Sequence, residues 1–314
     1  GVIDCSDPGA CSLGLVGASS VTITGVPGSG AELIRRAPYD APLVRIRDGR
    51  DITISNLILR DTELTSFCPI EESPEATPTV LVTDSSDVLF DRVEVAHARL
   101  RGFVFQDTVE RVTVRHSTIR DTYTHGIFSR ASGLTVEANE FHDTGAAAII
   151  VSGGSRVVVR NNLFARNHGS PPWMVQGGQI NIRDSRESSV VGNVLRDGAY
   201  CFDDSVTAGI ELGAHNAGLR IAGNWVHHNT GWGIKQNVDA TNSDTVVRDN
   251  CIHDNSDTLP AIDVPGAELR GNELTAGCQP APIGTLTAQP SPCTIAPGED
   301  RCRATLTWST RFAP

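Results

Sequence analysis

Short segments with alternating apolar and variable residues recur along most of the chain, and the alternation has a period of two. This period is typical of a β-strand with one buried face. Isoleucines occupy equivalent places in one set of segments, at positions 127, 149, 180, 210, 234 and 262. No long stretch shows the 3.6-residue period of a helix. The pattern therefore predicts an all-β protein of many short strands.

A second set of segments alternates with the first and carries an asparagine in one register. These asparagines are Asn139, Asn162, Asn193, Asn224, Asn250 and Asn272, separated by 23, 31, 31, 26 and 22 residues. A repeat of this length with three short strands per unit predicts a right-handed parallel β-helix. Stacked asparagines would let each amide bond to the next coil, so we interpret them as structural.

These repeats resemble the pectate-lyase-like superfamily over roughly residues 15–278. The resemblance implies a single-stranded, right-handed parallel β-helix. We predict one β-helix domain over residues 1–278, with a disulfide-tied N-terminal cap. After Cys278 the repeat stops, and residues 279–314 contain two strand-like runs around a Pro/Gly turn. They predict the start of a truncated immunoglobulin-like module or, alternatively, a cap that closes the helix.

Composition narrows the class of partner. The formal net charge of −11 argues against nucleic acid, whose phosphates require a basic face. No apolar run approaches the roughly 20 residues of a membrane span.

The eight cysteines are even in number and lack a CxxC pair. We predict the pairs Cys5–Cys11, Cys293–Cys302, Cys251–Cys278 and, by elimination, Cys68–Cys201. Disulfides indicate a secreted, cell-surface or periplasmic protein, which we expect to be a monomer.

Two coils carry long insertions before the first-set strand, at residues 167–178 and 198–208. Insertions in repeat folds gather on the functional face, so these predict the walls of a groove. Exposed aromatic rings suit the apolar faces of sugars. Candidate substrate-binding residues on or near these insertions are Trp173, Tyr200, Trp232, Asp203, Asp204 and His168.

The strands beside these insertions place three different polar groups in one row. If Ile180, Ile210 and Ile234 are buried, Asn181, Glu211 and Lys235 point outward on successive coils, about 4.8 Å apart. The same alternation turns Gln179 and Arg183 outward, and Asn237 follows as a further candidate for substrate binding. Lys235 is the only lysine beside 25 arginines. The alternative is a solvated face with an incidental Glu–Lys pair.

This row resembles polysaccharide lyase family six, the chondroitinase-B-like and alginate lyases. The resemblance implies a β-elimination in which Lys235 is the base, Arg183 neutralises the substrate carboxylate, and Asn181 with Glu211 holds calcium. Two positions depart from the family. Gly213, Ala214 and His215 follow Glu211 where those lyases place the lysine, and Gly213 stands where they carry a second acidic ligand.

Three alternatives stay open. Tyr123 and His125 form a second acid–base candidate, suited to a lyase or a uronate epimerase. Asp203 and Asp204 with Glu211 would suit a glycoside hydrolase. A non-catalytic glycan-binding surface protein is the third. We interpret the corner histidines as structural: they are His142, His227, His228 and His253. The first expectation is an exported enzyme that cleaves a uronate-containing polysaccharide.

Overall fold

The computed structural model describes residues 2–5, 12–35, 41–61, 77–168, 177–199, 207–237, 239–278, 284–289 and 305–310. The chain forms two compact units, Gly1–Gln279 and Pro280–Pro314. In the second unit, β29 (Gly284–Gln289) pairs antiparallel with β30 (Thr305–Thr310). Whether this unit starts an immunoglobulin-like module or caps the helix stays a prediction.

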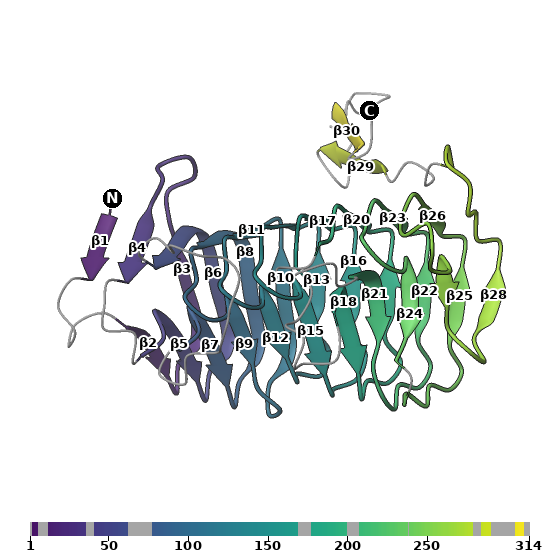
Figure 1. The fold of residues 1–314 in the computed structure, drawn as a ribbon. Helices are drawn as coiled ribbons and strands as arrows, with labels where there is room; N and C mark the ends of the chain where they lie inside the picture. The colour runs from purple at the N-terminus through teal and green to yellow at the C-terminus, as the bar shows by residue number, and fades with distance from the viewer. Residues whose placement is uncertain are drawn as a thin grey trace, which may run out of the picture. The chain divides into compact units, whose positions relative to one another are not determined.

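The first unit is a parallel β-helix, which confirms the predicted fold (Figure 1). One sheet contains ten parallel strands, each from a successive coil. They are β2 (Leu13–Val16), β5 (Val44–Arg47), β7 (Val80–Thr83), β9 (Phe103–Phe105), β12 (Ile127–Ser129), β15 (Ile149–Ser152), β18 (Gly178–Arg183), β21 (Ala208–Leu212), β24 (Ile234–Gln236) and β27 (Ile262–Asp263).

The remaining strands of this unit form an eighteen-stranded sheet that continues around the rest of each coil. They are β1 (Val2–Cys5), β3 (Ser19–Thr24), β4 (Glu32–Arg35), β6 (Arg50–Asp61), β8 (Ser86–Ala96), β10 (Glu110–Arg115), β11 (Thr118–Arg120), β13 (Thr135–Glu137), β14 (Glu140–His142), β16 (Val158–Arg160), β17 (Leu163–Ala165), β19 (Ser189–Val191), β20 (Val194–Arg196), β22 (Arg220–Ala222), β23 (Trp225–His227), β25 (Val246–Arg248), β26 (Cys251–His253) and β28 (Glu268–Arg270).

From β9 to β26 each coil therefore has three short strands, as predicted. In β6 and β8 the second and third strands run together as one long strand. Among the residues that the structure describes, none forms a helix that could cross a bilayer.

The core is a continuous aliphatic column between the two sheets. Five isoleucines of the first-set strands are fully buried, namely Ile127, Ile149, Ile180, Ile210 and Ile234, whereas Ile262 in the last coil is partly buried. The column also contains two groups of aromatic rings. Phe141 stacks on Phe164 at a centroid distance of 4.8 Å, and Phe90, Phe103 and Phe105 contact one another in edge-to-face or tilted arrangements. Each coil buries its apolar face only against its neighbours, so stacking supplies the burial that one coil cannot provide.

The predicted asparagine ladder is present at the corner between the second and third strands. From Asn139 to Asn250, each side-chain Nδ2 donates to Oδ1 of the ladder asparagine one coil on, at 2.8 to 3.0 Å. Each Nδ2 also donates to a backbone carbonyl, as Asn193 does to Val159 at 3.0 Å. The ladder satisfies buried turn groups that water cannot reach.

One predicted disulfide lies within the described residues. Cys251 in β26 is bonded to Cys278, and it ties the segment after β28 back to the preceding coil. The pairs Cys5–Cys11, Cys68–Cys201 and Cys293–Cys302 each include cysteines outside the described side chains, so they stay predictions.

Candidate functional site

The ten-stranded sheet brings the predicted polar row together. Strand pairing aligns Asn181 in β18 with Glu211 in β21, and Glu211 with Lys235 in β24. The three strands lie side by side in the middle and later coils (Figure 1). The row continues to Asp263 on one side and to Ile150 on the other. Register therefore places an amide, a carboxylate and an ammonium group on consecutive coils.

The three side chains contact one another directly. Asn181 Nδ2 donates to Glu211 Oε1 at 3.1 Å, and Lys235 Nζ lies 3.3 Å from Glu211 Oε2. The ammonium group also lies 4.7 Å above the centroid of the Trp232 ring, a cation–π contact. Trp232 precedes β24, so the lysine is held between a carboxylate and an aromatic face.

The row is buried, although it points away from the core. Asn181 is 3% exposed and Glu211 is 0% exposed, whereas the Lys235 side chain keeps 14%. The sequence predicts an open groove along this face, but at Asn181 and Glu211 the structure shows almost no open surface. Lys235 is consequently the member of the row that solvent can reach.

Burial changes the acid–base behaviour of Glu211. Loss of hydration raises the pKa of its carboxyl group, because the charged form is disfavoured away from water. Lys235, the Asn237 side chain and the backbone of Gly177 oppose this shift. The net direction is upward, so the Glu211 carboxyl group holds a proton more readily than an exposed glutamate does.

Arg183 lies at the end of β18, beside the row. Its Nε donates to Ser152 Oγ at 3.1 Å, and no described contact engages its terminal nitrogens. The side chain crosses the next coil at Gly213, where an added Cβ would lie 2.5 Å from Arg183 Cβ. Gly213 therefore makes room for the arginine, which explains why a glycine follows the Glu211 strand.

Gln179 does not point outward as predicted. It is fully buried in a corner, where Asn167 donates to its Oε1 at 2.9 Å and its Nε2 donates to Asn229 Oδ1 at 2.7 Å. The intervening coil has Gly198 at this corner, where an added Cβ would lie 2.5 Å from Asn229 Oδ1. A second amide ladder therefore runs through Asn167, Gln179, Asn229 and Asn255, and Gln179 takes the place of the side chain that Gly198 lacks. Because Gln179 is buried in this ladder, a substrate cannot contact it.

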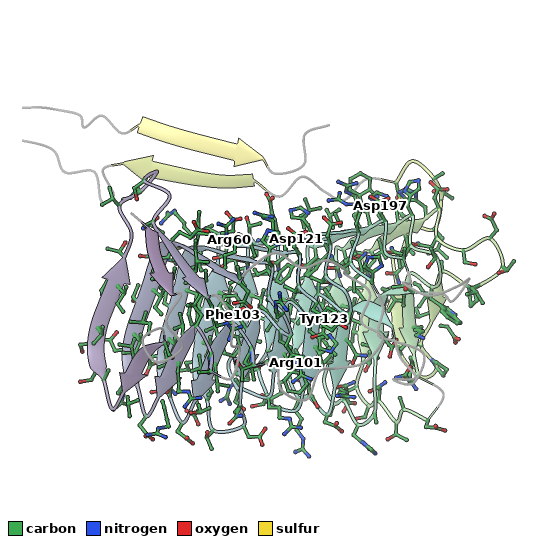
Figure 2. All side chains as sticks on the ribbon, turned by 60° about the vertical axis from the view of Figure 1, so that its left-hand side comes forward. Arg60, Arg101, Phe103, Asp121, Tyr123 and Asp197 are labelled. Atoms are coloured by element: carbon green, nitrogen blue, oxygen red, sulfur yellow. A yellow bond between two sulfur atoms is a disulfide. The ribbon has the colours of Figure 1, made fainter. Side chains whose placement is uncertain are left out.

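Tyr123 and His125, the second candidate pair, do not occupy the register of the Asn181–Glu211–Lys235 row, which continues through Ile150 to Phe128. His125 is 2% exposed, and burial together with Arg101 lowers its pKa to about 3. It is therefore neutral near neutral pH, which does not suit a general acid. Tyr123, which Figure 2 labels, lies two residues earlier. Its backbone N–H donates to the Ala98 carbonyl at 2.7 Å. His168 is partly buried with a lowered pKa, and its backbone bridges to Ala199.

Arg101 does not stand out in the sequence, because it is one of 25 arginines. Its guanidinium lies 4.6 Å above the Phe128 ring, next to His125 in the preceding coil, and Figure 2 labels it with Tyr123 and Phe103. The signal is its register: Arg101 occupies the position equivalent to His125, one coil earlier. Four other predicted site residues, Trp173, Tyr200, Asp203 and Asp204, lie outside the described residues.

Calcium fits the row poorly. Asn181 Oδ1 is buried without a hydrogen-bond partner among the described residues, which suits a cation. However, calcium takes about six to eight oxygen ligands, and within the part of the chain that the structure describes this row offers the Asn181 and Glu211 oxygens. Lys235 already balances the negative charge of Glu211. We therefore assign no step to a metal here.

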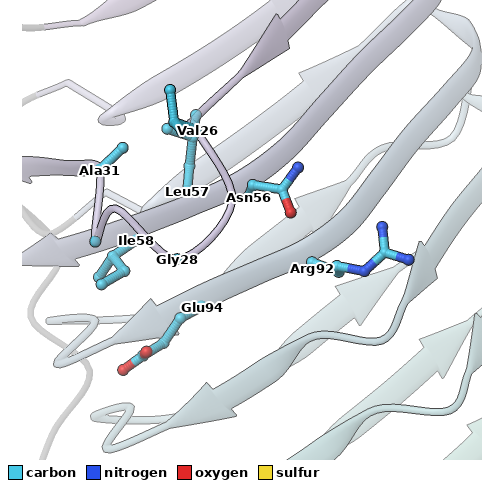
Figure 3. A pocket seen from close by; sticks show the side chains of 9 residues that line it. Val26, Gly28, Ala31, Asn56, Leu57, Ile58, Arg92 and Glu94 are labelled. Carbon is cyan, nitrogen blue, oxygen red and sulfur yellow. The ribbon is translucent and has the colours of Figure 1, made fainter.

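A surface depression lies on the other sheet, away from this row. Val26 and Gly28 in the turn after β3, Asn56 and Leu57 in β6, and Glu94 in β8 are among its lining residues (Figure 3). None of the predicted site residues lines it. The depression consequently adds no group to the row.

Comparisons with known proteins agree with the fold. The model of a family described as "Right handed beta helix region" matches residues 43–185 and, in an overlapping alignment, 104–279. A search of curated proteins finds no match. An alginate lyase from Paenibacillus sp. str. FPU-7 superposes with a TM-score of 0.55 at 13% identity, covering 88% of this chain and 99% of that chain.

Two further solved structures share the architecture at similarly low identity. The Agl-KA catalytic domain has a TM-score of 0.56 at 12% identity, covering 84% of this chain and 61% of that chain. PfbA, a surface adhesin of Streptococcus pneumoniae, has a TM-score of 0.55 at 11% identity, covering 90% and 77%. At these identities the likeness concerns the fold.

Proposed function

Because this chain belongs to the family of right-handed β-helix regions, we propose that it acts on a polysaccharide and cleaves a uronate-containing chain by β-elimination. One observation carries the proposal: the only lysine of the chain lies against Glu211 and over the Trp232 ring, on the outer face of a coil. The alginate lyase with the same architecture supports this choice of substrate class.

In the proposed reaction, Lys235 Nζ takes the proton from carbon five of the uronate. The electrons of that C–H bond form a double bond between carbons four and five, and the bond from carbon four to the glycosidic oxygen breaks. The leaving oxygen then takes a proton from the new ammonium group or from water. A base in this role needs an unprotonated form near neutral pH.

A base must be able to release its proton, and this requirement separates lysine from arginine. Burial raises the pKa of the neighbouring Glu211 carboxyl group, because its charged form loses hydration. The proposed step requires that Lys235 releases its proton before it meets the substrate. Arginine at this position would stay protonated throughout. The arrangement therefore requires lysine in a chain that otherwise uses arginine for its positive charges.

Arg183 is the proposed partner of the substrate carboxylate. Its terminal nitrogens have no described contact, and a guanidinium group binds a carboxylate through two parallel hydrogen bonds. Neutralising that carboxylate makes the proton at carbon five more acidic. A local cation also offsets the net charge of −11, which would otherwise repel an anionic polymer.

Lys235→Ala and Lys235→Arg test the assignment. The purified protein is incubated with alginate, pectate and glycosaminoglycans, and the unsaturated product is followed by its ultraviolet absorbance. We expect both variants to lose at least about a hundredfold in rate, the range of a lost general base. Arg111→Ala, which removes an exposed cation from the other sheet, serves as the control and should retain the rate.

An undiminished rate in Lys235→Ala would end the assignment of the base. The same assay with a calcium chelator addresses the metal: we expect no loss of rate, because the row offers few oxygen ligands. Release of reducing sugar without ultraviolet absorbance would identify a hydrolase instead. Exchange of the carbon-five proton without chain cleavage would identify an epimerase.

The burial of the row favours a second candidate, a non-catalytic glycan-binding surface protein. A carboxylate with 0% exposure cannot touch a substrate unless the surface above it rearranges. The surface adhesin PfbA has a similar architecture, so the fold also occurs in adhesins. Saturable binding of a polysaccharide, without any product, would select this function.

We also propose that the protein works outside the cytoplasm. The Cys251–Cys278 disulfide is stable in an oxidising compartment and is reduced in most cytosolic environments. This location fits either candidate function, since extracellular polysaccharides are available there.

A further inference from the structure

A second outward row runs along the ten-stranded sheet, beside the row that contains Lys235. Each member lies two residues further along its strand, and side chains two residues apart share one face of a strand. From β12 to β24 the members of this arginine row are Arg130, Ser152, Arg183, Gly213 and Asn237. The strands that carry them lie side by side in Figure 1. All four members with a side chain are exposed or half-buried, so solvent reaches this row.

The two arginines of this row lie two coils apart. Arg183 Nε donates to Ser152 Oγ at 3.1 Å, and no described contact engages its terminal nitrogens. Arg130 Nε lies 3.7 Å from Asp107 Oδ1, and the two side chains are 50% and 70% exposed. An ion pair with this exposure is weak, because water screens both charges. Arg130 can therefore exchange Asp107 for the carboxylate of a ligand.

An aromatic ring holds the Arg130 guanidinium group beside the lysine row. Arg130 Cζ lies 5.6 Å from the centroid of the Phe128 ring, and Arg101 Cζ lies 4.6 Å from the same centroid. Cation–π attraction favours both positions. Two positive groups therefore gather at β12, which is four coils from Lys235 in β24.

The coils on the other side of Lys235 are acidic. The residue in register with Lys235 in the last coil is Asp263, which is exposed. Residues 239–278 contain eight acidic residues and two arginines, which gives a formal charge of −6. Residues 77–168 contain ten acidic residues and ten arginines, so their charges balance. An anionic chain at Lys235 is therefore repelled by the last coils and accepted over the earlier ones.

We propose that Arg130 and Arg183 bind two carboxylates of one extended polyuronate chain, which runs along the coil axis from Lys235 toward β12. This inference rests on the proposed function, because it assigns the direction in which the substrate of that site lies. An extended 1,4-linked sugar chain advances by about one coil spacing per unit, so the two arginines face units that are two apart. Where successive units alternate in orientation, such units present their carboxylates on the same side.

The arrangement makes binding dependent on chain length. A chain that contacts both Lys235 and Arg130 spans four coils, or about 19 Å. A hexamer covers this distance, whereas a dimer at Lys235 ends before β12. Arg130 is thus a specificity-determining residue for long anionic chains, and each guanidinium group can hold a carboxylate through two hydrogen bonds.

The test measures binding of a dimer and a hexamer of 1,4-linked mannuronate to the full chain by calorimetry at low salt. Lys235→Ala is the background protein, so that no product forms during the titration. We expect Arg130→Gln in this background to weaken hexamer binding about tenfold more than dimer binding, in the range of a lost hydrogen bond to a charged group. The difference should shrink at high salt, because ions screen an exposed guanidinium group.

Arg160→Gln is the matched control. Arg160 in β16 is 49% exposed and pairs with one carboxylate, that of Glu137, but it lies on the eighteen-stranded sheet. The variant removes the same charge away from the arginine row, so we expect the hexamer affinity of the background protein. Equal hexamer binding by Arg130→Gln and Arg160→Gln, or no saturable binding of the hexamer, would overturn the proposal.

Asp263→Asn tests the direction of the chain. Loss of this charge should strengthen hexamer binding about threefold at low salt, because unit charges one coil apart interact weakly in water. Asp249→Asn removes an exposed charge of the same coils on the other sheet, at a φ of 53° that asparagine tolerates, and should have no effect. Equal effects of the two variants would show that Asp263 does not set the direction.

The parent protein and its Arg130→Gln variant separate this proposal from the proposed reaction. Ultraviolet-absorbing product, together with an unchanged hexamer affinity in Arg130→Gln, would keep the lyase and remove the arginine row from the substrate site. Hexamer binding that depends on Arg130, without any product from the parent protein, would keep the arginine row and remove the lyase.

Discussion

At the residue scale, His125 and Glu211 are two titratable side chains that the stacked coils bury. His125 is 2% exposed, and burial, followed by the charge of Arg101 in the preceding coil, lowers the pKa of its imidazole. Glu211 is 0% exposed beside a lysine, and its pKa rises. Both shifts arise from lost hydration. Neither follows from the residue type, because exposed copies of the same residues would titrate normally.

The His125 shift predicts a pH dependence of stability. The pKa is about 3 in the folded protein and 6.5 ordinarily. Below pH 6.5 the unfolded chain binds a proton at this residue and the folded chain does not, so stability falls as pH decreases toward 3. The slope from this residue is about 1.4 kcal/mol per pH unit. Urea unfolding at several pH values should show a shallower slope in His125→Asn.

The control for that measurement is His215→Asn, because the His215 side chain is 70% exposed. It removes one histidine from the unfolded chain without emptying a buried site. If His125→Asn retained the full slope of the parent protein, the acid sensitivity would have another origin.

At the scale of elements, the corners depend on amide ladders as much as on the apolar column. Gln179 is informative here, since its longer side chain from β18 reaches the corner where Gly198 leaves a gap. A period-two pattern assigns Gln179 to the outer face because it alternates with Ile180. Both residues are buried in the structure, because the Gln179 amide bonds to Asn167 and Asn229 at the corner, and the pattern alone does not locate these partners.

Asn193 lies in the middle of the first ladder and tests its contribution. Its Oδ1 accepts from Asn162 N and Nδ2, and its own Nδ2 donates to Val159 and Asn224. Asn193→Ala leaves several buried groups unpaired, so we expect a loss of about 3 kcal/mol in the free energy of unfolding. Chemical denaturation of the variant and the parent measures this loss.

Asn272→Ala is the matched comparison at the end of the ladder, where the side chain is partly exposed. Water can replace part of its bonding, so we expect a clearly smaller loss than for Asn193→Ala. Equal losses at the two positions would show that burial does not determine the strength of the ladder.

At the scale of the whole molecule, stability accumulates from contacts between neighbouring coils. The described coils pair in order from β2 to β27, and no strand of the ten-stranded sheet pairs beyond its neighbours. In such an array the terminal coils have one partner fewer and open first. The Cys251–Cys278 disulfide lies at this terminal position and restrains it.

Replacement of both cysteines by serine tests the restraint without reducing other bonds. The disulfide closes a segment with a sequence separation of 27, for which the expected stabilisation is about 3 kcal/mol. We expect hydrogen exchange to accelerate mainly in β26 and β28, while β12 and β15 keep their protection. Uniform acceleration along the coils would instead show that the β-helix unfolds as one cooperative unit.

The sequence by itself determined the coil architecture, the asparagine ladder and the row of Asn181, Glu211 and Lys235. Each of these depends on a period, and equivalent positions in a repeat must stack. Only the tertiary structure decided which outward groups are buried, how Gln179 replaces a missing rung, and how Arg101 meets the Phe128 ring. Those features depend on bends, side-chain directions and hydration at particular corners, and a period carries no information about them.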